Sequence, residues 1–195
     1  MKIDQYVMAY EVEQDRLRAI LPDGFLSLRP VLRINGEIRD GGSSYLELNT
    51  AVEIKGKKNW KGWLNIGYWN EAPFQKEKSG VRFQTEFLEI SFTRTGLEGN
   101  CPAEKDNEGC YFLEREISLR VPEVILEHKE FCDCRFSWNF SGQGACGVSM
   151  GKTLPAIPTE QRTAYPKQNF SVKNAALIPC KQVLGAYVVE FTRTR

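Results

Sequence analysis

The chain has 195 residues, of which 42% are hydrophobic and 26% are charged, and its formal net charge is +1. This length fits a single domain over residues 1–195 with a core of its own. The small net charge and the lack of a basic stripe exclude strong attraction to nucleic acid or to an anionic membrane. No apolar run approaches the roughly 18 residues that span a bilayer. The first residues contain no apolar signal segment, so we expect a cytoplasmic protein of bacterial type.

Six cysteines, an even number, raise the question of disulfide bonds. Three disulfides would be typical of a small secreted chain. Because we expect no export signal and the chain is long enough to bury a core, we predict reduced thiols. The cysteines are Cys101, Cys110, Cys132, Cys134, Cys146 and Cys180.

The first half of the chain predicts strands around one short helix. Residues 6–12 predict a strand, and residues 13–21 predict a helix that Pro22-Asp23-Gly24 ends. Residues 29–38 predict a second strand. Residues 45–54 alternate strictly, with Leu, Leu, Thr, Val and Ile on one face and Tyr, Glu, Asn, Ala and Glu on the other. A turn at 56–59 and a returning strand at 62–69 complete a long antiparallel hairpin.

The second half predicts further strands separated by polar loops. We expect loops at 70–80, 99–109 and 141–151, an extended stretch at 155–167, and helical turns at 122–129 and 174–178. Strands are predicted at 81–96, with a bulge or bend at Phe87-Leu88, and at 111–121, 131–140 and 182–193. About eight to ten strands with one or two short helices favour a mainly β fold, a closed or strongly curved antiparallel β-barrel. A barrel of this size can hold a small ligand.

Polar side chains gather on one face of the predicted hairpin and on the strand before it. They are Arg33, Asn35, Tyr45, Glu47, Asn49, Asn65 and Tyr68. Arg33 suits pairing with a carboxylate, and Glu47 suits proton transfer, so this face is a candidate pocket for a small organic acid or carbonyl compound. The alternative is that the same residues form the solvated face of a one-sided sheet.

Three other patterns have a structural and a functional interpretation each. His128, Cys132 and Cys134, together with Cys101 and Cys110 in a preceding loop, are plausible zinc donors. However, Cys132 and Cys134 fall on an apolar strand face, and we predict neither metal nor cofactor. The glycines at 142, 144 and 147 have dinucleotide-binding spacing and follow a predicted strand, but no helix begins after them and no βαβ unit surrounds them, which predicts a loop. A group of aromatic residues suits ligand stacking, core packing or a homo-oligomer contact. The group comprises Trp60, Trp63, Tyr68, Trp69 and Phe74.

Three segments in this order resemble the acetoacetate decarboxylase family: VMAYEVEQDRLRAILPDGF, VLRINGEI with SYLELNTAVEIKGKKNWKGWLNIGYWNE, and IPCKQVLGAYVVEFT. The resemblance implies that family's β-barrel fold and a small keto or carboxylic acid as ligand. It also implies two glutamates in the site, of which Glu47 matches one, while Asn35 stands in the place of the other.

The family's chemistry uses a lysine whose pKa is lowered by an adjacent lysine, so that the neutral amine forms a Schiff base. The matching region here, NEAPFQKEKSGVRFQ, has neither the Gly-Arg-Glu nor the Pro-Lys-Lys of that motif. Lys76 and Lys78 flank Glu77, which raises a lysine pKa, and Lys57-Lys58 lies at a turn. Two functions stay open: a keto or carboxylic acid enzyme that lacks the Schiff-base lysine, and a non-catalytic ligand-binding or assembly protein on the same barrel.

Overall fold

The computed structural model describes residues 1–94, 96–99, 110–113, 116–119, 124–141 and 165–194. Thirteen strands and two helices lie in these residues, and the strands form two sheets. The class is mainly β, as the sequence predicted. Neither described helix has the length and apolar composition needed to cross a bilayer.

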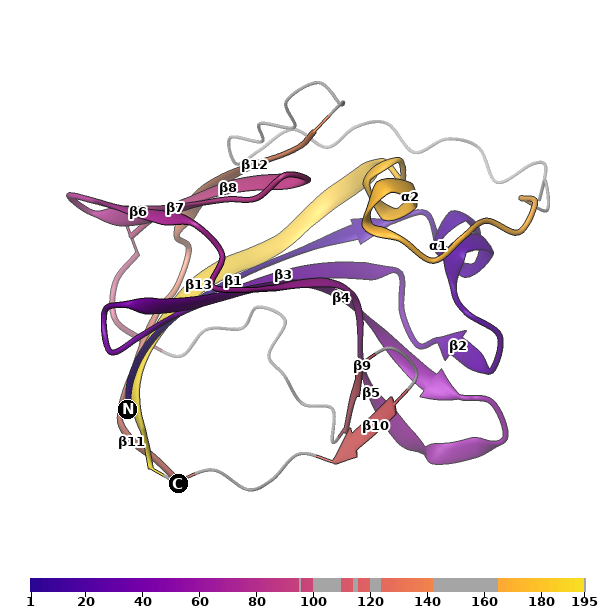
Figure 1. Ribbon diagram of the computed structural model, residues 1–195, viewed down its shortest axis with the longest axis horizontal. Helices are drawn as coiled ribbons and strands as arrows, with labels where there is room; N and C mark the ends of the chain where they lie inside the picture. Colours follow the sequence, from indigo (N-terminus) through magenta and orange to yellow (C-terminus); the bar gives the residue numbers. More distant parts are fainter. Residues whose placement is uncertain (95, 100–109, 114–115, 120–123, 142–164, 195) are drawn as a thin grey trace.

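The larger sheet curls strongly into a half-barrel (Figure 1). Its strand order is β10-β9-β5-β4-β3-β1-β13-β11. Strand β2 lies outside this order and pairs with the C-terminal residues 52–54 of β4. Every pairing in it is antiparallel except that of β5 with β9. The strands are β1 Lys2–Val12, β2 Phe25–Ser27, β3 Val31–Arg39, β4 Ser43–Ile54, β5 Lys57–Asn70, β9 Cys110–Leu113, β10 Glu116–Leu119, β11 Val124–Phe131 and β13 Cys180–Thr194.

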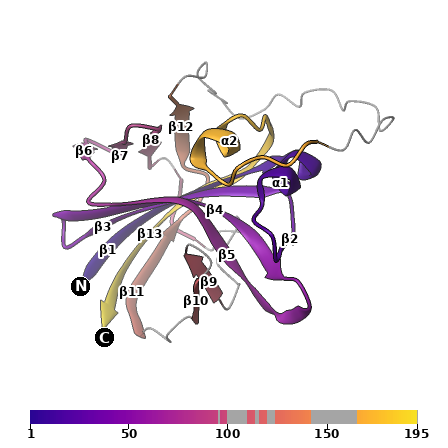
Figure 2. The same cartoon turned by 45° about the vertical axis from the view of Figure 1, so that its right-hand side comes forward.

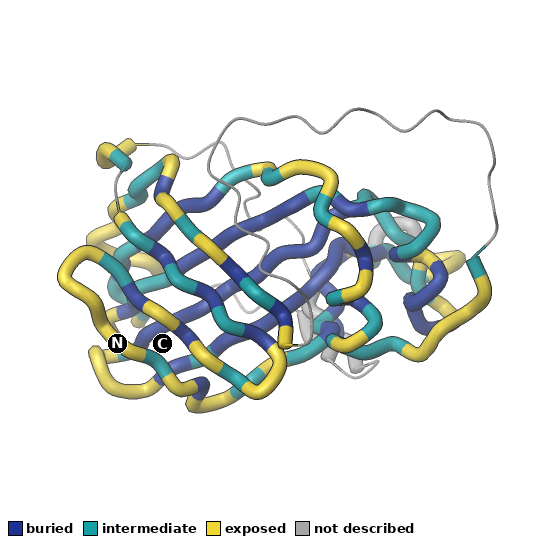
Figure 3. Tube along the Cα trace, turned by 90° about the horizontal axis from the view of Figure 1, so that it is seen from above, coloured by how far each residue is buried: buried dark blue, intermediate teal, exposed yellow. Residues whose placement is uncertain are grey.

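The smaller sheet packs on the outer face of the curl (Figures 1 and 2). It has the order β12-β8-β7-β6, with β12 at Arg135–Phe140, β8 at Leu88–Thr93, β7 at Gly80–Gln84 and β6 at Phe74–Glu77. Helices α1 (Gln14–Ile20) and α2 (Val172–Ala176) cover the same outer face beside it. The main core lies between these layers, and the central strands are buried along most of their length (Figure 3). Core side chains include Tyr6, Met8, Ile34, Leu48, Phe83, Ile90, Phe92 and Trp138.

The central strands are buried on both faces of the sheet. The outer face carries the apolar main core, and the inner face of the curl carries a second buried region that is more polar. Leu46 and Leu48 of β4 belong to the core on the outer face, whereas the alternating Glu47 and Asn49 point to the inner face. Small apolar clusters flank these polar residues on the inner face. One contains Ile3, Val7, Tyr187, Val189 and Phe191, and the other contains Ala9, Val31, Ala51 and Trp63.

The predicted elements of the first half are largely confirmed. The first strand is longer than expected, α1 lies within the predicted 13–21, and the β4–β5 hairpin has its turn at Lys55-Gly56. Helix α1 buries Leu17, Ala19 and Ile20 and ends where Leu21, which precedes a proline, turns extended. The helical turn near 174–178 and the long last strand are confirmed as α2 and β13.

Several predictions in the second half are wrong. The expected loop at 70–80 contains edge strand β6, whose residues are mostly exposed and so lack an apolar pattern. The single strand expected at 81–96 is the pair of strands β7 and β8, and the bulge or bend expected at Phe87-Leu88 is confirmed as the bend that separates them. The strand expected at 111–121 is the hairpin of β9 and β10, and the helical turn expected at 122–129 overlaps strand β11. The loop at 99–109 and the segment 141–164 lie, apart from residues 99 and 141, outside the described residues.

The cysteines also differ from expectation. Cys132 is disulfide-bonded, so the prediction of reduced thiols is wrong for this residue, whereas Cys134 and Cys180 are not in disulfide bonds. Cys132 and Cys134 lie between β11 and β12 and not on one continuous strand, because the chain turns at Asp133, whose φ is 55°. Among the described residues no three potential metal ligands come together, and His128 Nε2 lies 2.8 Å from Glu130 Oε1.

Candidate functional site

Strand register brings polar residues from β3, β4 and β5 into adjacent rows on the inner face. In one row Arg33 pairs with Asn49, and Asn49 pairs with Asn65. In the next row Asn35 pairs with Glu47, and Glu47 pairs with Tyr68. Directly paired side chains on one face of a sheet lie within contact distance. The four residues on β3 and β4 therefore form one polar patch: Arg33, Asn35, Glu47 and Asn49.

A bulge in β5 allows both of its polar residues to face the same side. The register shifts between Leu48 and Asn49, so that one more residue, Ile66, is accommodated on β5. Residues three apart on a regular strand point to opposite faces. Because of the bulge, Asn65 and Tyr68 both lie opposite inner-face residues of β4, while Ile66 packs in the main core.

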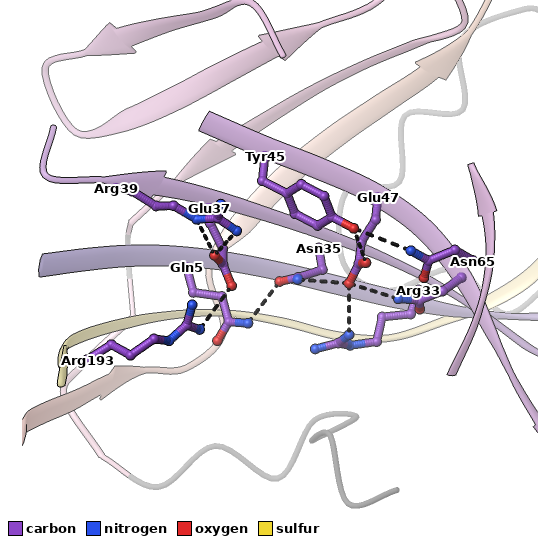
Figure 4. Close-up of polar contacts among 10 residues, drawn as sticks. Gln5, Arg33, Asn35, Glu37, Arg39, Tyr45, Glu47, Asn65 and Arg193 are labelled. Atoms are coloured by element: carbon purple, nitrogen blue, oxygen red, sulfur yellow. Dashed lines mark hydrogen bonds and ion pairs between the residues drawn. The ribbon is translucent and has the colours of Figure 1, made fainter. Parts of the chain in front are cut away.

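Glu47 is the centre of this patch (Figure 4). Its Oε1 accepts hydrogen bonds from Asn35 Nδ2 and Asn49 Nδ2, each at 3.0 Å, and lies 3.8 Å from Arg33 Nη1. Its Oε2 accepts a hydrogen bond from the Tyr45 hydroxyl at 2.8 Å. Glu47 is 3% exposed, Asn49 0% and Arg33 1%, so the alternative that these residues form a solvated sheet face is wrong.

Burial controls the electrostatics of the carboxylate. It raises the pKa of Glu47 above its ordinary value, because the charged form loses its hydration, while Arg33 and the hydrogen bonds from Asn35 and Tyr45 act in the opposite direction. Burial together with the nearby charge of Glu47 raises the pKa of Tyr45 as well, so its phenol stays protonated at neutral pH. A carboxylate with a raised pKa is a suitable acid or base for proton transfer.

The network continues along β3 to residues that sequence reasoning missed. Gln5 Nε2 donates to Asn35 Oδ1 at 3.0 Å. Glu37, 6% exposed, accepts hydrogen bonds from Arg39 Nε at 2.9 Å and Arg39 Nη2 at 2.8 Å, and Arg193 Nη2 lies 3.5 Å from its other oxygen (Figure 4). Glu37 could have been found from alternation, because it lies two residues after Asn35. Gln5 and Arg193 lie on distant strands, and no local signal places them here.

Charge and unsatisfied polar atoms on the inner face favour an anionic, hydrogen-bonding ligand. The arginines 33, 39 and 193 carry one positive charge more than the carboxylates of Glu37 and Glu47. Within the described residues, the buried atoms Asn49 Oδ1, Asn65 Oδ1 and Trp63 Nε1 have no hydrogen-bond partner. Each such atom costs about 1–3 kcal/mol, which hydrogen bonds to a ligand would offset.

The residues predicted from sequence are therefore placed as follows. Six of them form the patch around Glu47: Arg33, Asn35, Tyr45, Glu47, Asn49 and Asn65. Tyr68 lies at its edge and is 36% exposed. The predicted aromatic group does not form one cluster: Trp63 packs on the inner face under the guanidinium of Arg33, while Trp69 and Phe74 pack against the main core.

Solved structures with the same fold were found, whereas no protein-family profile matches the chain and no curated protein sequence is significantly similar to it. The acetoacetate decarboxylase of Legionella pneumophila has a TM-score of 0.55 at 13% identity, covering 99% of this chain and 83% of that one. An acetoacetate decarboxylase-like enzyme from Sphingomonas wittichii has a TM-score of 0.58 at 9% identity, covering 100% and 91%.

The enduracididine biosynthesis enzyme MppR, solved with pyruvate bound, has a TM-score of 0.53 at 8% identity, covering 98% of this chain and 85% of that one. At these identities the likeness is one of fold. The chain thus has the acetoacetate decarboxylase-like fold, which confirms the expected architecture, in the form of a curled half-barrel.

Proposed function

We propose that the inner face of the half-barrel binds a small keto or carboxylic acid and that Glu47 takes up and returns a proton from the carbon next to the ligand's carbonyl. The observation that supports this most is the buried Arg33–Glu47 pair, surrounded by amide and hydroxyl donors, in a cluster whose three arginines (33, 39 and 193) outnumber the carboxylates of Glu37 and Glu47. Arg33 would bind the ligand carboxylate. Glu47, with its raised pKa, would act as the base.

The fold supports the choice of ligand class. MppR, which has this fold, was solved with pyruvate and with the condensation product of pyruvate and imidazole 4-carboxaldehyde. A 2-oxo acid presents a carboxylate for Arg33 and an adjacent carbonyl that makes the neighbouring C–H bond acidic. Asn49, whose Oδ1 has no partner within the described residues, offers an acceptor for a further polar group.

We propose further that this chemistry proceeds without a Schiff base. Every lysine whose side chain is described is exposed, including Lys57, Lys76 and Lys78, the lysines considered from sequence. A nucleophilic lysine amine needs a site that depresses its pKa, and solvent exposure does not provide one. Borohydride reduction in the presence of pyruvate or acetoacetate should therefore leave the chain's mass unchanged. A reduced adduct on any lysine would contradict this part of the proposal.

Proton transfer can be tested by exchange of the pyruvate methyl protons in D2O, followed by NMR. Wild-type protein should accelerate the loss of the methyl signal, and Glu47→Gln should reduce that acceleration by about 100-fold or more. Glu53→Gln is the matched control, because Glu53 lies on the same strand near its far end and contributes nothing to the patch. It should exchange like wild type.

A second candidate, ligand binding without chemistry, is favoured by one observation: the oxygens of Glu47 already accept three hydrogen bonds. Calorimetric binding of 2-oxo acids without any proton exchange would support this candidate. If neither binding nor exchange is found with pyruvate and longer 2-oxo acids, the proposed function is wrong.

A further inference from the structure

Both carboxylate oxygens of Glu47 already accept hydrogen bonds from protein side chains. Oε1 accepts hydrogen bonds from the amide groups of Asn35 and Asn49 and lies 3.8 Å from Arg33 Nη1. Oε2 is in contact with the Tyr45 hydroxyl at 2.8 Å, and the whole residue is 3% exposed. Tyr45 and Asn65, in contrast, are partly exposed. Tyr45 is therefore a partly exposed residue that hydrogen-bonds directly to Glu47.

The hydrogen bonds around Tyr45 have a defined direction. An ionised carboxylate only accepts, so the Tyr45 hydroxyl must donate its hydrogen to Oε2 of Glu47. Its oxygen then accepts from Asn65 Nδ2 at 3.3 Å, which fixes the orientation of that amide. A hydroxyl oxygen has two lone pairs, and the hydrogen bond from Asn65 uses one of them. The second lone pair can receive a proton from a ligand.

Resting on the proposed function, we propose that Tyr45 is the residue that contacts the reacting carbon and that it relays the proton to Glu47. The substrate C–H bond breaks, and its electron pair stays on the substrate as an enolate. The Tyr45 oxygen gains this proton while its own O–H bond breaks and that proton passes to Glu47 Oε2. Tyr45 ends unchanged and Glu47 ends as a neutral carboxylic acid. The Glu47 proton then exchanges with solvent, and the reverse steps return a solvent-derived proton to the carbon.

The surrounding charges suit this relay. The pKa of Tyr45 is raised by burial and by Glu47, so the phenol does not ionise in advance, and the two protons move together. The guanidinium of Arg39 lies 5.3 Å from the centre of the Tyr45 ring, which holds the ring in place. When Glu47 becomes neutral, Arg33 loses its negative partner 3.8 Å away and can balance the charge of the enolate.

The test compares two Tyr→Phe substitutions, each of which removes a hydroxyl that donates to a glutamate. Tyr45→Phe removes the hydroxyl, and we expect the pyruvate exchange rate to fall by about 100-fold while the dissociation constant for pyruvate changes little. Tyr165→Phe is the matched control, because the Tyr165 hydroxyl likewise donates to a glutamate, Glu13 Oε1 at 2.7 Å, but lies outside the patch around Glu47. It should keep the wild-type exchange rate. Circular dichroism and thermal unfolding establish that each variant is folded.

A double variant separates a relay from a merely structural role. If Tyr45 and Glu47 act as one unit, Tyr45→Phe combined with Glu47→Gln should lose no more activity than either single substitution. Losses that multiply, or a Tyr45→Phe variant that exchanges like wild type while Glu47→Gln does not, would overturn the relay and leave the proposed function standing. Wild-type protein that neither binds nor exchanges pyruvate would overturn both.

Discussion

Gly36→Ala tests how closely the two sheets approach each other. Gly36 lies on β3 with its α-carbon facing the smaller sheet, and it does not have a positive φ. A Cβ there would lie 2.9 Å from Phe83 Cε2, 3.0 Å from Phe83 Cζ and 3.4 Å from Leu46 Cδ1. The first two distances are shorter than a normal carbon contact, so the Phe83 ring must shift. That ring is fully buried between Tyr6 and Phe74.

The net effect follows from two opposing contributions. Overpacking of a tight core costs about 1–3 kcal/mol. Alanine also lowers the conformational entropy of the unfolded chain, which stabilises the folded state by about 0.4–1 kcal/mol. We therefore expect Gly36→Ala to lower the free energy of unfolding by about 1–2 kcal/mol, measured by urea denaturation with tryptophan fluorescence. The melting temperature should fall by about 2–4 °C for each kcal/mol.

A second substitution shows whether the Phe83 ring causes this loss. Phe83→Leu shortens the side chain, so in the double variant the new methyl group of Gly36→Ala occupies space that the ring has left. The double variant should be more stable than the sum of the single effects predicts, by about 0.5 kcal/mol or more. A Gly36→Ala variant as stable as wild type, or strictly additive effects with Phe83→Leu, would refute the argument that this contact limits the approach of the sheets.

Three further predictions concern the site and the helix beside it. Burial raises the pKa of Glu47 above its unfolded value, so its contribution to stability is full below the unfolded pKa and is lost as pH rises through the folded pKa. The stability of Glu47→Gln relative to wild type should thus increase from about pH 4 to about pH 7 in urea titrations, and a flat or falling difference would contradict this. Gly67→Ala places a Cβ 2.3 Å from Val172 Cγ2, so it should destabilise by about 1–3 kcal/mol, and adding Val172→Ala should recover part of the loss. Ser171→Ala removes the side chain that accepts from the Asn174 N–H at the start of α2, which should cost about 1 kcal/mol, whereas Ser171→Gly should cost only a few tenths.

Local sequence patterns were sufficient to predict an element and the direction of its side chains where one face of that element is apolar and the other is polar. The alternation of residues 45–54 placed Glu47 and Asn49 together on one face of a strand, and the structure has them there. The same reasoning failed for β6, because an edge strand with mostly exposed residues needs no apolar face. The prediction of a helical turn at residues 122–129 failed as well, because pairing with the distant strand β13 forms strand β11 there.

The sequence by itself determined the mainly β class, the central hairpin and the side of it on which the polar residues lie, since these depend on alternation and turn residues within one stretch of chain. Only the tertiary structure decided that this polar side is buried, because the curl of the sheet depends on how distant strands pair. It also decided that Gln5 joins the hydrogen-bond network around Glu47, that Arg193 meets Glu37 beside that network, and that the bulge at Ile66 turns Tyr68 to the same face. Burial, in turn, is what raises the pKa of Glu47, because removal of water is a property of the assembled fold and of no local segment.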